Sequence, residues 1–453
     1  MTNVADTAPS SSQSGASRWR RLLRILGSAW ELLRLRFAQT EIDLRVFGML
    51  VALAIILLGF NVLSDGKFFV PNNMVTLAIQ ATSVAIIATG MVLVIVSRNI
   101  DLSVGSLTGF VAMSYALLMT DWLPNVMGIG PDFPFRWLIA LGMGIGIGAA
   151  FGTVQGFIVA YIGVPSFVVT LGGLLSIRGA VWYLSNGAAV TGLDPTFQLL
   201  NGGAEGSIGG TLTWVVGIVG CIAVVALLAN RRRQRRRFGF PVRPVWATIA
   251  LGVLACAAIL GLTYFANGNY WPAGLAHQYA VAHGITEPDG GLKISAGFPI
   301  PIMLLIGVTL LMTWMANRRS FGRYVYAFGG NPDAAELAGI NTRWTIMKTF
   351  ILMGVLCALS AAVASARLNG ATLDIGVSYE LYVIAAAVVG GTSFAGGIGT
   401  IPGAVLGAFV MASLKYGLSF LGVNSPGQNV AAGIVLILAV AFDAYTRRRG
   451  GRR

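Results

Sequence analysis

The chain has 453 residues, of which 56% are hydrophobic and only 11% are charged, and its formal net charge is +14. Soluble proteins carry about 25% charged residues, and their surface helices set a charged face against an apolar one. Such faces are absent from most of this sequence, which excludes a water-soluble protein of several domains and indicates a protein that uses lipid as its solvent.

The first 45 residues divide into two parts. Residues 1–17 are rich in Ser, Thr and Ala, and we expect a disordered cytoplasmic tail there, with no cleavable signal peptide. Residues 18–45 place apolar side chains from Trp19 to Phe37 at helical spacing, with arginines largely between them. This pattern predicts a basic amphipathic helix on the inner leaflet. A mobile basic tail that only fixes orientation is the alternative.

Apolar segments then recur as far as residue 443. Ten of the twelve approach or exceed the ~18 to 20 residues that span a hydrocarbon core, and two are shorter. The pattern predicts an all-α, polytopic membrane protein with about 10–12 transmembrane helices across residues 46–443. The segments are 46–63, 74–97, 103–120, 135–162, 165–184, 212–229, 245–265, 299–316, 345–366, 380–390, 401–420 and 429–443.

One of these segments, 135–162, carries glycines four residues apart. Gly144, Gly148, Gly152 and Gly156 leave one face of a helix without side chains. The spacing predicts that another helix approaches this face closely.

Two interruptions stand near the two ends of the apolar region. SRNIDLSVGS at 97–106 follows the second segment, and GGTSFAGGIGTIPG at 390–403 follows the tenth, where its glycines and Pro402 would break a continuous helix. Irregular backbone at membrane depth is tolerated where protein buries it or where it lines an aqueous cavity. The interruptions therefore predict discontinuous helices of the kind at which many transporters bind solute. Plain surface loops are the alternative.

The basic residues indicate how the chain is oriented. If the N-terminus is cytoplasmic and the segments alternate, 24 Lys and Arg residues lie in inner loops and tails and three lie in outer loops. This asymmetry follows the positive-inside rule, so both termini, including the basic tail 444–453, are predicted to be cytoplasmic. The rule also accounts for RRRQRRR in the basic insert 230–244 without any nucleic-acid partner.

The cysteines and histidines do not form a metal-binding pattern. The three cysteines lie in apolar segments, where we expect them to act as small packing residues. They are Cys221, Cys256 and Cys357. His277 and His283 share the outer loop 266–298 with Glu287, but no third firm ligand accompanies them, so we expect no metal site.

The inner loop 317–344 specifies a short helix on the cytoplasmic face. Asn331 can cap it, Pro332 suits its first position, Asp333 favours the positive end of its dipole, and Gly339 suits its end. Structured loops often carry function, so we expect a docking element here. A simple connector is the alternative.

Four motifs in this order resemble the monosaccharide permeases of bacterial ATP-binding-cassette importers, most of all the xylose type, from about residue 46 to 443. The basic insert and the apolar segment after it also resemble the xylose type. The motifs are IDLSVGS at 100–106, VPSFVVTLGGLLSIRG at 164–179, GNPDAAELAGINT at 330–342 and VVGGTSFAGGIGTIPGAVLGA at 388–408.

The resemblance implies a transport subunit of the inner membrane that works with other chains. These would be a second permease copy, a cytoplasmic ATPase that binds ATP and Mg, and an extracytoplasmic sugar-binding protein. The helix from Pro332 to Ala338 would be the coupling helix that docks on the ATPase. The docking residues so implied are Asn331, Pro332, Asp333, Ala334, Ala335, Glu336, Leu337 and Gly339.

The sequence agrees with this division of labour. It contains no GxxxxGK[ST] phosphate loop, so we expect no bound nucleotide and no enzymatic activity on this chain. ATP hydrolysis would have to come from the partner.

Polar residues in or beside the apolar segments are candidates for the translocation path, because sugars are bound by amides, hydroxyls and carboxylates. Asp101 counts as one, since an ionisable group near a membrane span is costly, but we favour a helix N-cap for it. The other candidates are Gln80, Ser103, Gln155, Asn186, Thr392 and Ser393. Bonding to a neighbouring helix is the ordinary alternative for such residues.

Three other functions compete with a sugar permease. A secondary transporter driven by an ion gradient would carry carboxylates or histidines in mid-span, and this chain has almost none. An importer permease for branched-chain amino acids would share the general plan. A membrane enzyme would need a catalytic set that converges in the spans, which we do not find in the sequence.

Overall fold

We describe the protein from a computed structural model, which defines residues 44–289 and 291–450. The predictions for the tail 1–17 and for nearly all of 18–45 lie outside the described residues, as does the end of the tail 444–453. The described chain forms two compact units, a smaller one of residues 218–260 and a larger one of residues 45–217 and 261–450.

All twelve predicted apolar segments are helical, and the all-α polytopic fold is confirmed. Among the described residues, nine helices are long and apolar enough to cross a membrane by length and composition. They are α2 (Leu44–Leu63), α3 (Pro71–Val96), α5 (Arg136–Phe157) with its π-helical continuation η2 (Ile158–Ile162), α6 (Ser166–Ser185), α8 (Gly210–Arg237), α9 (Val245–Asn267), α11 (Ile300–Arg318), α14 (Thr342–Leu368) and α16 (Ile401–Phe420).

The other three apolar helices have shorter apolar stretches. Two of them were expected to be short, namely α15 (Tyr379–Val389) and α17 (Ser425–Gly450), whose apolar part is Ser425–Leu438. The third differs from expectation, because the segment 103–120 holds a 14-residue α-helix, α4 (Val104–Leu117), that continues as the π-helix η1 (Leu118–Val126). Pro124 lies inside η1, where it removes a backbone donor and so disfavours a regular α-helix.

Smaller elements connect these helices. They are α7 (Pro195–Gln198), the 3-10 helix η3 (Leu199–Asn201), α10 (Ala273–His283), α12 (Ser320–Gly330), α13 (Pro332–Leu337) and the strands β1 (Val190–Thr191) and β2 (Gly370–Ala371). The two strands pair antiparallel, with Val190 opposite Ala371.

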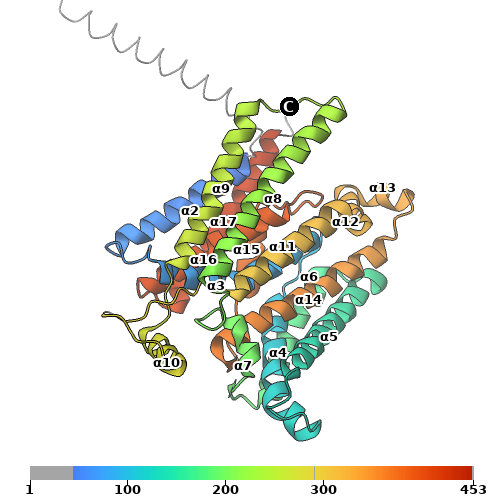
Figure 1. The fold of residues 1–453 in the computed structure, drawn as a ribbon. Helices are drawn as coiled ribbons and strands as arrows, with labels where there is room; N and C mark the ends of the chain where they lie inside the picture. Colours follow the sequence, from blue (N-terminus) through green and yellow to red (C-terminus); the bar gives the residue numbers. More distant parts are fainter. Residues whose placement is uncertain (1–43, 290, 451–453) are drawn as a thin grey trace, which may run out of the picture. The chain divides into compact units, whose positions relative to one another are not determined.

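Helix α3 forms the core of the larger unit. Every residue from Ala85 to Val96 is buried, because α3 packs against α11, α14, α15 and α16 (Figure 1). A helix that is apolar on all sides can be buried on all sides. The interruption that follows α3 at residue 97 therefore begins inside the protein.

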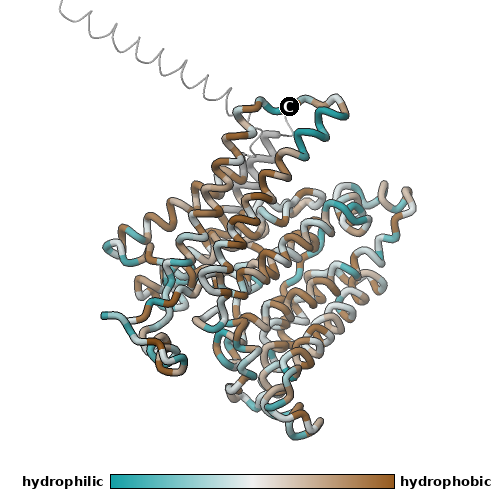
Figure 2. The backbone as a smooth tube through the Cα atoms, in the orientation of Figure 1, coloured by the Kyte–Doolittle hydropathy of each residue, from teal (hydrophilic) through white to brown (hydrophobic). Residues whose placement is uncertain are grey.

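Helices at the outside of the larger unit expose large apolar side chains. On α2, Val62 is 75% exposed and Ile55 is 65% exposed, and Figure 2 shows the hydrophobic colouring along this helix. Leu175 on α6 is likewise exposed. Such surfaces fit hydrocarbon rather than water, as the composition requires.

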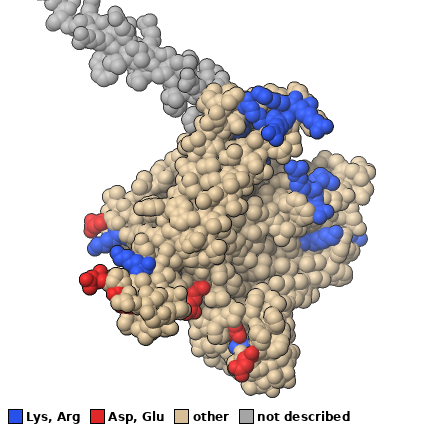
Figure 3. Space-filling view, viewed as in Figure 1, with Lys and Arg blue, Asp and Glu red and all other residues tan. Residues whose placement is uncertain are grey.

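Charged side chains gather at the ends of the helices of the larger unit. On the face shown in Figure 3, most Lys and Arg of this unit lie over α12 and its surroundings, whereas Asp and Glu lie mostly at the other end, together with a smaller group of Lys and Arg. This separation fits the predicted asymmetry between an inner and an outer side.

The predicted glycine face of α5 packs against α14. A side chain at Gly148 would meet the carbonyl of Gly354, and one at Gly152 would meet the carbonyl of Phe350. The prediction of a close helix approach is confirmed.

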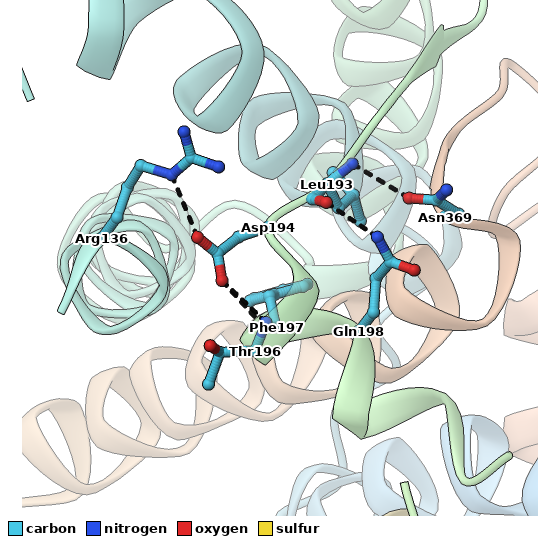
Figure 4. A network of polar contacts seen from close by, with 7 residues as sticks. All are labelled: Arg136, Leu193, Asp194, Thr196, Phe197, Gln198 and Asn369. Atoms are coloured by element: carbon cyan, nitrogen blue, oxygen red, sulfur yellow. Dashed lines mark hydrogen bonds and ion pairs between the residues drawn. The ribbon is translucent and has the colours of Figure 1, made fainter. Parts of the chain in front are cut away.

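A buried ion pair joins α5 to the segment before α7, and the sequence analysis did not anticipate it. Arg136 Nε lies 3.1 Å from Asp194 Oδ2, and both side chains are 7% exposed. Asp194 Oδ1 also accepts the backbone N–H of Thr196 at 2.9 Å and of Phe197 at 3.3 Å (Figure 4). A buried pair needs such extra bonds to offset the loss of water.

We expect Gly148→Ala to lower the free energy of unfolding by about 1–3 kcal/mol, because the added methyl group forces α5 and α14 apart. Thermal unfolding of the purified chain in detergent would measure the loss. Gly146→Ala on the same helix is the matched control, since nothing lies within 4 Å of the added atom. Equal stability of the two variants would contradict the close approach at Gly148.

Candidate functional site

The two interruptions of the sequence meet at the end of α3. The N–H of Gly397 donates to the carbonyl of Val96 at 3.0 Å, and a side chain at Gly399 would touch Val96 and Val92 at 2.9 and 3.0 Å. Residues 97–103 and 390–400 are both outside any helix. The prediction of broken helices is confirmed, and the structure adds that the two breaks pack together.

Arg98 joins both breaks to α12. Its Nε donates to the carbonyl of Gly329 at 2.8 Å, and its terminal nitrogen donates to the carbonyl of Gly330 at 3.0 Å. A side chain at Gly396 would lie 2.6 Å from the Arg98 stem. Arg98 thus supplies donors to the last carbonyls of α12, which no helical N–H can reach. We call the contact of residues 96–98, 329–330 and 396–399 the inner junction.

Helix α13 follows the inner junction directly and forms as the sequence predicts. Asn331 Oδ1 accepts the N–H of Ala334 at 3.1 Å, Pro332 is the first helical residue, and Gly339 has a φ of +77° that suits a helix end. The helix ends at Leu337, with Ala338 as its C-cap.

The surface of α13 has an apolar tip. Leu337 is 90% exposed, whereas Ala335 is buried against the protein at 4%. Glu336 Oε1 accepts a hydrogen bond from Thr342 at 3.0 Å, which fixes α13 to the start of α14. Asp333, Ala334 and Glu336 are also exposed. The element therefore presents a fixed apolar side chain with carboxylates beside it.

Asp101 lies in the first interruption and is almost fully buried, at 2% exposure. The backbone N–H of Ser103 donates to Asp101 Oδ1 at 2.9 Å, and the Ser103 hydroxyl donates to the same oxygen at 2.7 Å. The Ser103 oxygen accepts from Gln155 Nε2 at 2.9 Å. Three of the predicted path residues thus form one chain of hydrogen bonds between the interruption and α5.

The prediction that Asp101 is the N-cap of α4 is wrong. The N-cap residue is Ser103, and no side chain caps this helix. Asp101 instead closes a turn before the helix begins, as short acidic side chains commonly do. Burial raises the pKa of its carboxyl, which favours the neutral form.

A second polar group near the start of α4 was missed in the sequence. A side chain at Gly105 would lie 2.5 Å from Glu380 Oε2, and Arg178 donates to the carbonyls of Leu373 and Ile375 at 3.0 and 3.2 Å. Arg178 and Glu380 are also close enough to interact through their charges. Each is a charged residue within an apolar segment of the sequence, and such residues in membrane proteins usually have a function.

The remaining path candidates do not join this network. Thr392 and Ser393 are buried, and their hydroxyls have no partner in the described chain. Gln80 is half-buried on α3. Asn186 is exposed at the end of α6, where its φ of +52° gives it the role of a C-cap.

The described residues contain no group of three His, Cys, Asp or Glu side chains that could hold a metal ion. His277 Nδ1 lies 2.7 Å from Glu287 Oε1, and the ring of His283 stacks on Tyr279. In the smaller unit, Cys221 and Cys256 lie opposite each other, with each sulfur within 4 Å of the other's carbonyl.

Comparison with known proteins points to one family. The profile described as "Branched-chain amino acid transport system / permease component" matches residues 198–440. The xylose transport system permease protein of Escherichia coli (strain K12) is 35% identical over 409 residues, which cover 90% of this chain and 94% of the relative. The ribose import permease protein of the same strain is 31% identical, with 87% and 92% covered. The galactose/methyl galactoside import permease protein is 27% identical, with 89% and 96% covered. No solved structure matches the chain.

We expect Asp101→Asn to preserve the stability of the protein, because the amide oxygen can still accept both bonds from Ser103 and mimics the neutral acid. Asp101→Ala should lower the free energy of unfolding by about 1–3 kcal/mol, since it leaves the buried backbone N–H of Ser103 unpaired. Thermal unfolding and solute uptake would be measured for both variants. If Asp101→Asn kept its stability but lost uptake, Asp101 would have to act through its charge.

Proposed function

Because this chain belongs to the family of transport-system permease components that includes xylose and ribose permeases, we propose that it translocates a monosaccharide as a subunit of an ATP-driven importer, with xylose as the favoured sugar. The named activities of its relatives support this choice. No catalytic role on this chain is part of the proposal, and it involves no nucleic acid.

The single observation that carries the proposal is the inner junction. Helix α13 presents the exposed Leu337 to the cytoplasm in the proposed orientation, and it continues from α12, whose last carbonyls are bound by Arg98. Arg98 belongs to the first interruption and touches the second. A displacement of α12 and α13 by an ATPase would therefore reach both broken helices at once, which is what a coupling element must do.

The importer would need three further partners. A cytoplasmic ATPase would bind ATP and Mg and dock on residues 331–339, and an extracytoplasmic binding protein would deliver the sugar. A second copy of this chain would complete the pathway, as the resemblance to importer permeases implies.

The proposed orientation places both termini in the cytoplasm and the protein in the inner membrane. The exposed Lys and Arg side chains around α12 support it (Figure 3), and so do 24 inner against three outer basic residues in the sequence. The outer side then holds α7, α10 and the ion pair of Arg136 with Asp194.

Uptake into vesicles tests the proposal directly. The chain would be reconstituted with its ATPase and binding protein, and labelled xylose, ribose, galactose and leucine would be offered with and without ATP. We expect ATP-dependent uptake of xylose above the others. Uptake that needs no ATP but collapses with the ion gradient would contradict the proposal, and uptake of leucine alone would assign the chain to amino-acid import.

Leu337→Asp tests the docking element separately. Insertion of a carboxylate at the apolar tip should abolish co-purification of the ATPase, because burying an unpaired charge in an interface is costly. The fold should be unchanged, since Leu337 is exposed and Glu336 keeps its bond to Thr342.

Val281→Asp is the matched control for this test. Val281 is 69% exposed on α10, at the proposed outer side, so the same charge there should leave ATPase binding intact. Equal binding of the ATPase by both variants would exclude α13 as the docking element.

A further inference from the structure

A large cavity in the larger unit lies away from the inner junction and from Asp101. Its volume is about 700 Å³, and its walls come from the start of α3, the segment 201–204, the segment 268–272 and the end of α14. Small-molecule sites commonly measure roughly 300–1,000 Å³. In the proposed orientation this cavity opens on the outer side, where a binding protein would release its sugar. We call it the outer cavity.

Residues 268–272 of the outer loop build one wall of the outer cavity, and backbone hydrogen bonds hold them in place. The backbone N–H of Trp271 donates to the carbonyl of Ile294 at 2.9 Å, and the backbone N–H of Ala296 donates to the carbonyl of Asn269 at 2.9 Å. The N–H of Gly209 donates to the carbonyl of Ala296 at 2.9 Å. These bonds fix Asn269 and Trp271 on a rigid support, as a binding site requires.

Three polar side chains of the outer cavity are free to bind a ligand, whereas Asn201, which also lines it, already accepts the backbone N–H of Gly203. The side-chain amides of Asn72 and Asn269 have no hydrogen-bond partner in the described chain, and the Arg367 guanidinium has neither a hydrogen bond nor an ion pair there. Each amide offers both a donor and an acceptor, and the guanidinium offers a fork of donors. Hydroxyl groups on adjacent sugar carbons need this mixture.

An aromatic ring completes the lining. Trp271 is half-buried, and the ring of Tyr279 packs edge-on against it at 5.7 Å between centroids. A held indole can cover the apolar C–H face of a sugar ring. No carboxylate lines the cavity, so nothing in it would compete with the sugar for Arg367.

We propose that the outer cavity is a monosaccharide-binding site on the permease itself, in which Asn72, Asn269 and Arg367 bind the hydroxyls and Trp271 covers the ring. The proposal deepens the proposed function and rests on it for the class of solute. It assigns a role to the outer loop 266–298, which supplies two of the four binding residues. A pocket that receives only a carboxylate of the binding protein would need Arg367 but not the two amides or the indole.

Binding of xylose to the full chain in lipid nanodiscs, without the binding protein, tests this site. The chain contains ten tryptophans, so the fluorescence change on addition of xylose would be compared between Trp271→Phe and Trp122→Phe. Trp122 is an exposed tryptophan that lies outside the cavity. We expect the change to disappear only in Trp271→Phe.

The affinity for xylose would then be measured by calorimetry in two further variants. Asn269→Ala and Arg367→Met should each weaken binding by about tenfold, because each removes hydrogen bonds to the ligand. Lys293→Met is the matched control for the charge, since Lys293 is an exposed residue of the same outer loop that does not line the cavity. Its affinity should equal that of the unmodified chain.

Two outcomes would overturn the inference alone, and a third would overturn it together with the proposed sugar specificity. One is sugar binding that is absent or unaffected by both variants while ATP-dependent sugar uptake is normal, in which case the proposed function stands and the site falls. The other is weakened association of the binding protein with unchanged sugar affinity, which would make the cavity a protein-docking pocket. If no monosaccharide is taken up but leucine binds and depends on Asn269 and Arg367, the proposed sugar specificity fails together with this site.

Discussion

Backbone carbonyls at the end of a helix or in an irregular stretch have no helical N–H partner, so another group must bind them. This chain uses an arginine for this purpose twice. Arg98 donates to the carbonyls at the end of α12, and Arg178 donates to the carbonyls of Leu373 and Ile375 in the irregular stretch before α15. The second interruption contributes glycines, whose lack of side chains lets Gly397 bind the carbonyl of Val96. The helix breaks are tolerated because these groups bind the backbone carbonyls near them.

The same bonds also provide a physical connection between the proposed docking helix and the interruptions. The carbonyls that Arg98 binds are the last of α12, and the next residue, Asn331, caps α13. The docking helix α13 follows the end of α12 directly, and hydrogen bonds rather than flexible linkers connect the end of α12 to the interruptions. Because packed elements switch between discrete arrangements instead of deforming continuously, a shift of α13 would be passed on to the interruptions.

Sequence rules succeeded where a feature depends on neighbouring residues. The caps of α13, the glycine spacing of α5 and the two helix breaks follow from local chemistry, and each is present. Arg98 could not be assigned, because its partners are more than 230 residues away. The role of Asp101 was also predicted wrongly: its pattern fits a cap, but the N-cap of α4 is Ser103, two residues later. The outer cavity likewise combines four distant segments.

The contacts at the two sides of the larger unit differ in how readily they can break. Arg98 is exposed and bonds to neutral carbonyls, and water can replace such a bond at a cost of about 1.5–3 kcal/mol or less. Arg136 and Asp194 are buried as a charged pair, and separating one partner from the other costs about 3–5 kcal/mol. A force applied at α13 would therefore open the inner junction before it disturbed α5 and α7. The outer side would act as the fixed frame against which the broken helices move.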